Sequence, residues 1–448
     1  MKRRLFEMLN NYAESESSRY HMPGHKGKGD GILSSVYPYD ITELSFSDNL
    51  AEPRGIIDFT EKDIAALTGA KKVRILTGGS SLGVLTTVYA AAMFFKGKRN
   101  KIVLPKSSHK SVYNAMKILG LEPVFINEKI VDGLPLFNVE DIAELCDNGA
   151  IGVFLTSPDY FGRCVDLEYA EKITKKNGCF LMVDGAHGAH MAFTDKKHYA
   201  GTYADIWVES AHKTLKTLTQ GALLGINDLR LSYFAEDGLS IFSTSSPNYL
   251  IMSSVEDGYK SFAEIPESVF ENCKKAKSVF AERLRKDYSV INSDDFLKLC
   301  IDLKGKTDGA TAGKLLEENG IFAELACGRF LIFMISPYFN EEQAIKLVTA
   351  LNNLPVNGEN DCECSSVLAP ERKMSYTAAA DSCAEWVDLK AANGRISAGE
   401  VGLFPPCFPL VTAGEMFDNE LIARLLTGNT FGIKDGKVKV VVNAANEY

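Results

Sequence analysis

The chain has 448 residues, of which 46% are hydrophobic and 24% are charged, the proportions of an ordinary globular protein. This length predicts two or three domains. The formal net charge of −9 argues against nucleic acid as the main partner, because neutralising phosphates requires clustered Lys and Arg. An acidic chain is compatible with a small cationic substrate.

The sequence predicts neither a signal peptide nor a membrane-spanning segment. Residues 1–9 are basic, but polar residues such as Glu7 and Asn10 interrupt the apolar stretch that a signal peptide needs. The most apolar segments are too short or too polar to span a bilayer. The ten cysteines include one CxC, Cys362 and Cys364, and no pair of CxxC motifs. We therefore expect a cytoplasmic protein with reduced thiols and no metal.

In chain order, residues 1–54 read as an amino-terminal arm, and residues 21–27 are HMPGHKG. From residue 55 the pattern changes to helices alternating with short apolar strands, which is typical of a mainly parallel sheet covered on both faces. The expected helices cover residues 58–68, 80–95, 111–119, 139–146 and 167–177, and the expected strands cover 101–104, 123–126, 151–155, 179–183 and 205–208.

The second half of the chain predicts further domains. A long polar helical stretch runs from about 250 to 290, and more strands and helices follow to residue 354. A polar linker covers 355–364. The predicted division is thus an arm (1–54), a large domain (55–250), a connecting helix with a small α+β domain (251–354) and a carboxy-terminal domain (365–448).

Polar clusters directly follow three predicted strands: TSPD at 156–159, DGAH at 184–187 and SAHK at 210–213. Parallel sheets bind ligands at the carboxyl ends of their strands. Asp184 and Lys213 are the pair that pyridoxal phosphate (PLP) needs, a carboxylate against the pyridine nitrogen and a lysine that holds the aldehyde as an imine. Each residue alone is more typical of a helix cap or a solvated loop.

Two further segments support a phosphate-bearing cofactor. Residues 77–83, TGGSSLG, stand where a loop becomes a helix, so glycine backbone and the Ser80 and Ser81 hydroxyls can approach an anion. His109 follows the 101–104 strand, and its flat ring can stack on a cofactor ring. A Gly/Ser-rich helix start or an isolated His is by itself a modest signal.

The extended lysine motif resembles that of the Orn/Lys/Arg decarboxylases, PLP enzymes with the aspartate-aminotransferase fold. Residues 210–220 read SAHKTLKTLTQ, against the family pattern SxHKxxxxLTQ. Further similar stretches are spread over most of the chain: HMPGHKG at 21–27, DITEL at 40–44, DGAHGAH at 184–190, STSSP at 243–247, PPCFPL at 405–410, and Gly414 with Glu415.

The resemblance implies a role for each matching position. Lys213 would form the Schiff base, Asp184 would pair with the pyridine nitrogen, and Ala186 and His109 would cover the two ring faces. His187 belongs to the implied cofactor set, and His212 and Lys213 are candidates for the proton donor. The residues implied around the phosphate are Gly79, Ser80, Ser81, Ser210 and His212 and, across a homodimer interface, Thr244 and Ser245. Glu415 and His25 are implied to bind substrate.

The implied reaction converts arginine, lysine or ornithine to the corresponding amine and CO2, in polyamine metabolism. Departures from the family pattern at Cys407 and Ala413 put the choice of substrate in doubt. Gly185 stands at a position that varies in the family, and Lys216 stands where a Pro is frequent. The chain resembles the short Gram-positive type, which lacks an amino-terminal receiver-like domain. An aminotransferase or lyase of the same fold and a catalytically silent PLP-binding protein remain alternatives.

Overall fold

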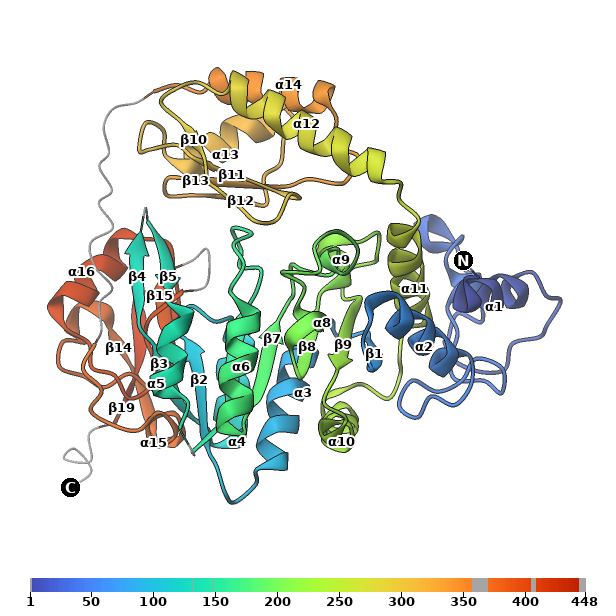
Figure 1. The fold of residues 1–448 in the computed structure, drawn as a ribbon, viewed down its shortest axis with the longest axis horizontal. Helices are drawn as coiled ribbons and strands as arrows, with labels where there is room; N and C mark the ends of the chain where they lie inside the picture. Colours follow the sequence, from blue (N-terminus) through green and yellow to red (C-terminus); the bar gives the residue numbers. More distant parts are fainter. Residues whose placement is uncertain (1, 132, 148, 357–369, 404–407, 443–448) are drawn as a thin grey trace. The chain divides into compact units, whose positions relative to one another are not determined.

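The computed structural model describes residues 2–131, 133–147, 149–356, 370–403 and 408–442 (Figure 1). The chain forms two compact units. The first comprises Met1–Ala90, Thr156–Leu167 and Met182–Asn360, and the second comprises Ala91–Leu155, Glu168–Leu181 and Asp361–Tyr448. These units group residues by contact, and the four-part division expected from the sequence stays a proposal.

Seven strands form the main sheet in the order β1-β9-β8-β7-β6-β2-β3 (Figure 1). The pairs β2/β3, β2/β6 and β7/β8 are parallel, whereas β9 runs antiparallel to both β1 and β8. The predicted α/β fold with a mainly parallel sheet is therefore confirmed. The bounds are β1 Lys72–Leu76, β2 Lys101–Pro105, β3 Glu122–Ile126, β6 Ala150–Thr156, β7 Phe180–Asp184, β8 Ile206–Glu209 and β9 Ala222–Ile226.

Most predicted elements lie within one or two residues of their expected place. The helices α2 (Ile56–Thr68), α3 (Gly79–Phe94), α4 (Lys110–Leu119) and α6 (Leu167–Asn177) all form. Strands β1 and β9 and the hairpin of β4 (Glu128–Val131) and β5 (Leu134–Phe137) were not expected. The predicted helix over 139–146 is a 3-10 turn, Val139–Asp141, followed by the short α5, Ile142–Leu145.

The single helical stretch expected over 250–290 was wrong. Two helices form instead, α11 (Tyr249–Ala263) and α12 (Glu267–Arg283), and Pro266 stands directly before the second. Proline disfavours helical geometry in the residue before it and lacks the N–H that a continuous helix would use. The first unit also holds a four-stranded sheet, β10-β11-β13-β12, with α14 (Glu341–Asn352) packed on α12. Its bounds are β10 Ser289–Val290, β11 Lys298–Asp302, β12 Leu325–Cys327 and β13 Phe330–Met334.

The amino-terminal arm contains a helix, α1 (Arg4–Ala13), that the sequence reading missed. Leu5 and Leu9 lie one turn apart on its buried face. The Glu256 carboxylate on α11 accepts hydrogen bonds from the backbone N–H groups of Arg4 and Leu5 at 2.7 and 2.8 Å. Because the first N–H groups of a helix have no partner within it, this carboxylate caps α1.

The second unit has its own small sheets and core. One sheet has the order β14-β19-β18 and the other β16-β15-β17. Their bounds are β14 Ala384–Asp388, β15 Val401–Leu403, β16 Phe408–Val411, β17 Thr430–Phe431, β18 Ile433–Lys434 and β19 Lys437–Val441. Buried apolar side chains of this core include Leu389, Val401, Phe417 and Leu421. No helix in the described ranges is both long and apolar enough to cross a bilayer.

Candidate active site

The polar clusters expected at strand ends meet at one edge of the main sheet. Strands β7 and β8 are parallel, and β1 has the same direction because two antiparallel pairings through β9 relate it to β8. The carboxyl ends of all three strands therefore lie at the same edge, where parallel sheets place their ligand sites. Asp184 ends β7, Lys213 follows β8, and Gly79 follows β1.

Lys213 lies on the short helix α9 (Ala211–Thr214). Its backbone N–H donates to the Ser210 carbonyl at 3.0 Å, and the preceding N–H of His212 donates to the Gly221 carbonyl at 3.1 Å. The Lys213 Nζ lies 3.2 Å from Nε2 of His187. Burial lowers the pKa of Lys213, and the charges of Asp184 and Glu324 act in the opposite direction. A lowered pKa favours the neutral amine, which is the nucleophilic form.

Asp184 is buried at the end of β7, where its loop is tied to the neighbouring strand. The Gly185 N–H donates to the Val208 carbonyl at 2.9 Å, and the Asp184 carboxylate accepts from the Ala186 N–H at 3.1 Å. The negative charge of the Asp184 carboxylate favours the charged form of Lys213, so the two groups influence one another electrostatically. A buried carboxylate of this kind suits a cationic partner such as a protonated ring nitrogen.

Residues 79–81 form the start of α3, where the sequence predicts an anion-binding site. Gly79 has a φ of +73°, a left-handed conformation that favours glycine, and a Cβ there would meet no atom within 4 Å. The Ser210 Oγ donates to the Ser80 Oγ at 2.7 Å, so two hydroxyls from different strand ends meet beside the helix N-terminus. Ser81 is exposed. Backbone N–H groups, the helix dipole and hydroxyl groups are the donors that a phosphate prefers.

These groups fit PLP on three counts visible in the structure. An amine and a buried carboxylate share one sheet edge with a hydroxyl-bearing helix N-terminus. Open space stands over Gly79. The buried Oγ of Thr156, at the end of β6, has no hydrogen-bond partner among the described residues, so a polar group remains for a ligand atom.

The remaining site residues predicted from the sequence differ in their position and in their hydrogen-bond partners. His109 belongs to the second unit, where it caps α4, its Nδ1 lying 2.8 Å from the Ser111 Oγ. His212 places Nδ1 3.2 Å from the Gly221 carbonyl. Thr244 and Ser245 are exposed in the segment after α10 (Ser232–Phe242). His25 pairs with Asp40 at 3.2 Å and stacks on Tyr37.

Glu415 is already bound by two cations within the second unit. Its Oε2 accepts from the Lys106 Nζ at 2.7 Å, and its Oε1 accepts from the Arg372 guanidinium at 3.2 Å. Burial lowers the pKa of Lys106, and the charge of Glu415 opposes that shift. A substrate cation at Glu415 would therefore have to compete with these two partners. Residues 405–407 of the nearby PPCFPL stretch, and Cys362 and Cys364, lie outside the described residues.

The sequence did not predict the polar side chains that contact His187 and His190 near Lys213. The Lys298 Nζ lies 2.9 Å from Nδ1 of His187. Asp295 binds the buried His190 through Oδ1 at 2.9 Å. The repeated His in DGAHGAH was a signal for the two histidines, but nothing in the sequence connected them to residues 295–298. Across the described ranges, no cluster of three or more His, Cys, Asp or Glu residues could hold a metal ion.

Comparison with known proteins identifies the family of the chain. Residues 4–304 match the family model for the major domain of Orn/Lys/Arg decarboxylases, and the chain belongs to that family. It is 27% identical over 465 residues to an arginine decarboxylase of Bacillus subtilis, covering 96% of this chain and 94% of that protein. It is 28% identical to the B. subtilis protein YaaO, described as uncharacterized, over 94% of this chain and 93% of that one.

Solved structures support the same fold. A lysine decarboxylase of Francisella novicida superposes with a TM-score of 0.80 at 17% identity, covering 98% of this chain and 81% of that one. The constitutive lysine decarboxylase of E. coli gives the same TM-score and identity, over 98% of this chain and 82% of that one. At this level of identity the likeness concerns the fold.

Proposed function

We propose that this protein is a PLP-dependent decarboxylase that converts arginine, lysine or ornithine to the corresponding amine and CO2. The observation that carries the proposal is the meeting of Lys213, with its lowered pKa, the buried Asp184 and the hydroxyl-bearing start of α3 at one sheet edge. Family membership supports the reaction type.

In this proposal the cofactor, when bound, supplies a conjugated ring that withdraws electrons from the substrate Cα. Lys213 would hold it covalently and later displace the amine product. Asp184 would keep the ring nitrogen protonated by its negative charge, Ala186 and His109 would cover the ring faces, and His187 would lie beside it. Gly79, Ser80, Ser81, Ser210 and His212 would hold the phosphate, and His212 or Lys213 would return a proton to Cα.

The substrate proposal draws on the relatives. Several Bacillus relatives are arginine decarboxylases, and the similar structures include lysine decarboxylases. A product of either reaction is a polyamine or its precursor, so we propose a role in polyamine metabolism in the cytoplasm. We further propose a homodimer in which Thr244 and Ser245 reach the phosphate of the other subunit, with Glu415 and His25 near the substrate.

The test is a decarboxylation assay with three carboxyl-labelled substrates. Purified protein loaded with PLP is incubated separately with arginine, lysine and ornithine, and labelled CO2 and the amine are both measured. We expect equal amounts of CO2 and amine from at least one substrate. Keto acid without CO2 would instead indicate an aminotransferase, and no turnover of any of the three would exclude the substrate class.

A further inference from the structure

His187 lies between two lysine amines. Its Nε2 is 3.2 Å from the Nζ of Lys213, and its Nδ1 is 2.9 Å from the Nζ of Lys298. The imidazole is 5% exposed and Lys298, at the start of β11, is 1% exposed. Bulk water is thus largely excluded from His187 and Lys298, whereas Lys213 is partly exposed.

The number of hydrogen-bond donors and acceptors on these three side chains limits how many of them can be charged. A lysine ammonium can only donate hydrogen bonds, whereas a neutral imidazole has one N–H and one bare nitrogen. A neutral His187 can therefore accept from one ammonium only, and the amine at its N–H must be neutral to accept. If the ring were protonated, both amines would have to be neutral. At least one of Lys213 and Lys298 is consequently uncharged.

One geometric feature, an aromatic ring beneath its amine, favours Lys298 as the lysine that keeps the remaining proton. Its Nζ lies over the face of Tyr160, 5.4 Å from the ring centroid, a position that stabilises a cation. Burial lowers the pKa of Lys298, and the charge of Lys213 acts in the same direction, whereas the charges of Asp295 and Glu324 oppose the shift. The rings of His187 and Tyr160 are nearly perpendicular, and their centroids lie 5.3 Å apart.

Two carboxylates among the described residues favour the charged form of Lys213. They are Asp184 on β7 and Glu324, which stands directly before β12. Asp184 is the carboxylate that we assign to the cofactor ring, so in the loaded protein its charge would be balanced by the ring nitrogen.

We propose that Lys298 is a positioning residue of the active site, whose ammonium donates to Nδ1 of His187 and so fixes the tautomer in which Nε2–H donates to the neutral amine of Lys213. This inference rests on the proposed role of Lys213. In this proposal His187 and Lys298 keep the Lys213 amine neutral and fix its orientation, without themselves contacting the substrate.

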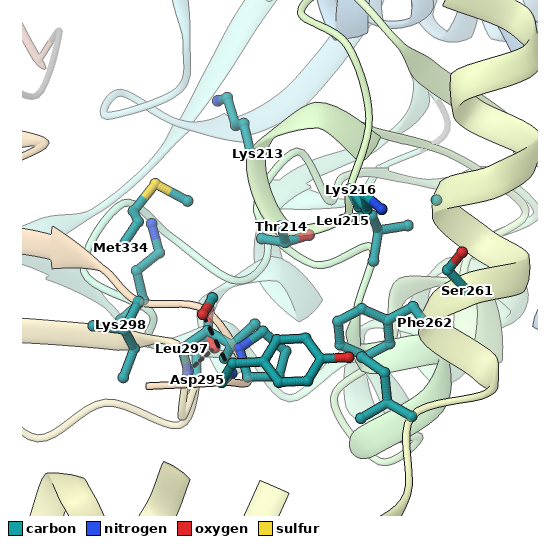
Figure 2. A pocket seen from close by; sticks show the side chains of 16 residues that line it. Lys213, Thr214, Leu215, Lys216, Ser261, Phe262, Asp295, Leu297, Lys298 and Met334 are labelled. Carbon is teal, nitrogen blue, oxygen red and sulfur yellow. Dashed lines mark hydrogen bonds between the residues drawn. The ribbon is translucent and has the colours of Figure 1, made fainter. Parts of the chain in front are cut away.

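The segment before β11 holds Lys298 in place. The Asp295 carboxylate accepts from the Leu297 N–H at 2.8 Å and pairs with His190, both side chains having no exposed surface. Lys213 and Lys298 come from different elements, and Met334 lies beside Lys298 (Figure 2). All three line a pocket of about 390 Å³.

The experiment measures the reactivity of Lys213 in the cofactor-free protein. Trace acetylation with acetic anhydride over a pH series, followed by peptide mass spectrometry, gives the titration of this one amine. In Lys298→Met, His187 can present a bare Nε2, so the charged form of Lys213 is stabilised. We expect labelling of Lys213 at neutral pH to fall roughly tenfold, as for a shift of one pKa unit, and Lys298→Arg to restore it.

Lys277→Met is the matched control. The Lys277 Nζ donates to the carbonyls of Phe296 and Lys298 at 3.0 and 2.8 Å, so its loss loosens the same segment without touching His187. We expect its Lys213 profile to match the wild type within twofold. An unchanged profile in Lys298→Met, or equal shifts in both methionine variants, would overturn the proposal.

A measurement on the unmodified protein covers the case in which Lys298→Met fails to fold. Nitrogen-15 NMR of the cofactor-free protein with labelled histidine, assigned through His187→Asn, should show the proton of His187 on Nε2. A proton on Nδ1, or on both nitrogens at neutral pH, would contradict the inference. Because neither experiment uses cofactor or substrate, a failed decarboxylation assay would sink the proposed function and leave this result standing.

Discussion

Asp184 is the residue whose charge the proposed chemistry uses most directly. It is buried at the end of β7 and its carboxylate also holds the loop through the Ala186 N–H. Asp184→Asn keeps the shape and an acceptor oxygen but removes the charge, so we expect kcat to fall roughly 100-fold, as for loss of one preorganised electrostatic group. Steady-state kinetics with excess PLP measures this.

Asp184→Glu is the companion variant, because it keeps the charge and changes only the reach. We expect it to retain more activity than Asp184→Asn. Equal activity of Asp184→Asn and the wild type would show that the carboxylate has no part in the reaction.

The lowered pKa of Lys213 gives a prediction for the pH dependence of cofactor loading. Its pKa is lowered by burial, so the amine loses its proton at lower pH than an ordinary lysine, whose pKa is about 10.4. The neutral form is the one that reacts, and loading should therefore slow as the pH falls through the lowered pKa. Stopped-flow absorbance after mixing cofactor-free protein with PLP measures the midpoint. A midpoint at or above the ordinary value would contradict this expectation.

The sequence identified the residues that follow strand ends and missed those that reach the site from elsewhere. Asp184 and Lys213 directly follow strongly apolar strands, so the carboxyl-end rule predicts that they lie together, whereas Ser80 is predicted from the glycine- and serine-rich start of its helix. Lys298 belongs to a different sheet and reaches His187 only through the tertiary fold. No local pattern marks such a residue, because a buried lysine at a strand start looks like an ordinary surface position.

At the scale of elements, the capping of α1 by Glu256 gives a stability prediction. The same carboxylate accepts from the buried Lys260 Nζ at 2.9 Å and from two N–H groups of α1. Glu256→Ala leaves that ammonium without this partner and the helix start uncapped, so we expect a loss of about 3 kcal/mol in unfolding free energy. Urea denaturation measures it.

Limited proteolysis of the same variant should show earlier cleavage within α1. Glu264→Gln is the control, because Glu264 pairs with Arg3 at the surface, where such pairs contribute little. Unchanged stability of Glu256→Ala would show that the capping of α1 by Glu256 does not contribute to the stability of the fold.

The elements that the sequence failed to predict share a physical cause. β1 contains the buried Arg74, which is paired with Glu61 at 3.2 Å, so a charge interrupts the apolar run by which buried strands are recognised. Pro266 marks the break between α11 and α12, but the helical pattern of the flanking sequence predicts one continuous stretch. Long, uninterrupted apolar strands such as β6 were predicted because nothing in them competes with the pattern.

At the scale of the whole molecule, the proposed shared active site predicts complementation between inactive variants. If Thr244 and Ser245 serve the phosphate of the other subunit, a Thr244→Ala/Ser245→Ala double variant and Lys213→Ala should each be inactive alone. Mixed and reassembled in equal amounts, half of the dimers would be mixed and would carry one intact site. We expect about a quarter of wild-type activity. No recovery, with mixed dimers demonstrated by native mass spectrometry, would contradict a shared site.

The central claim is that Lys213 holds the cofactor, and one measurement tests it most directly. The protein is loaded with PLP, reduced with borohydride and digested, and the peptides are analysed by mass spectrometry. We predict one pyridoxyl group per chain, on Lys213, and none in Lys213→Ala. A pyridoxyl group on another lysine such as Lys298, or no stoichiometric label at all, would contradict the account.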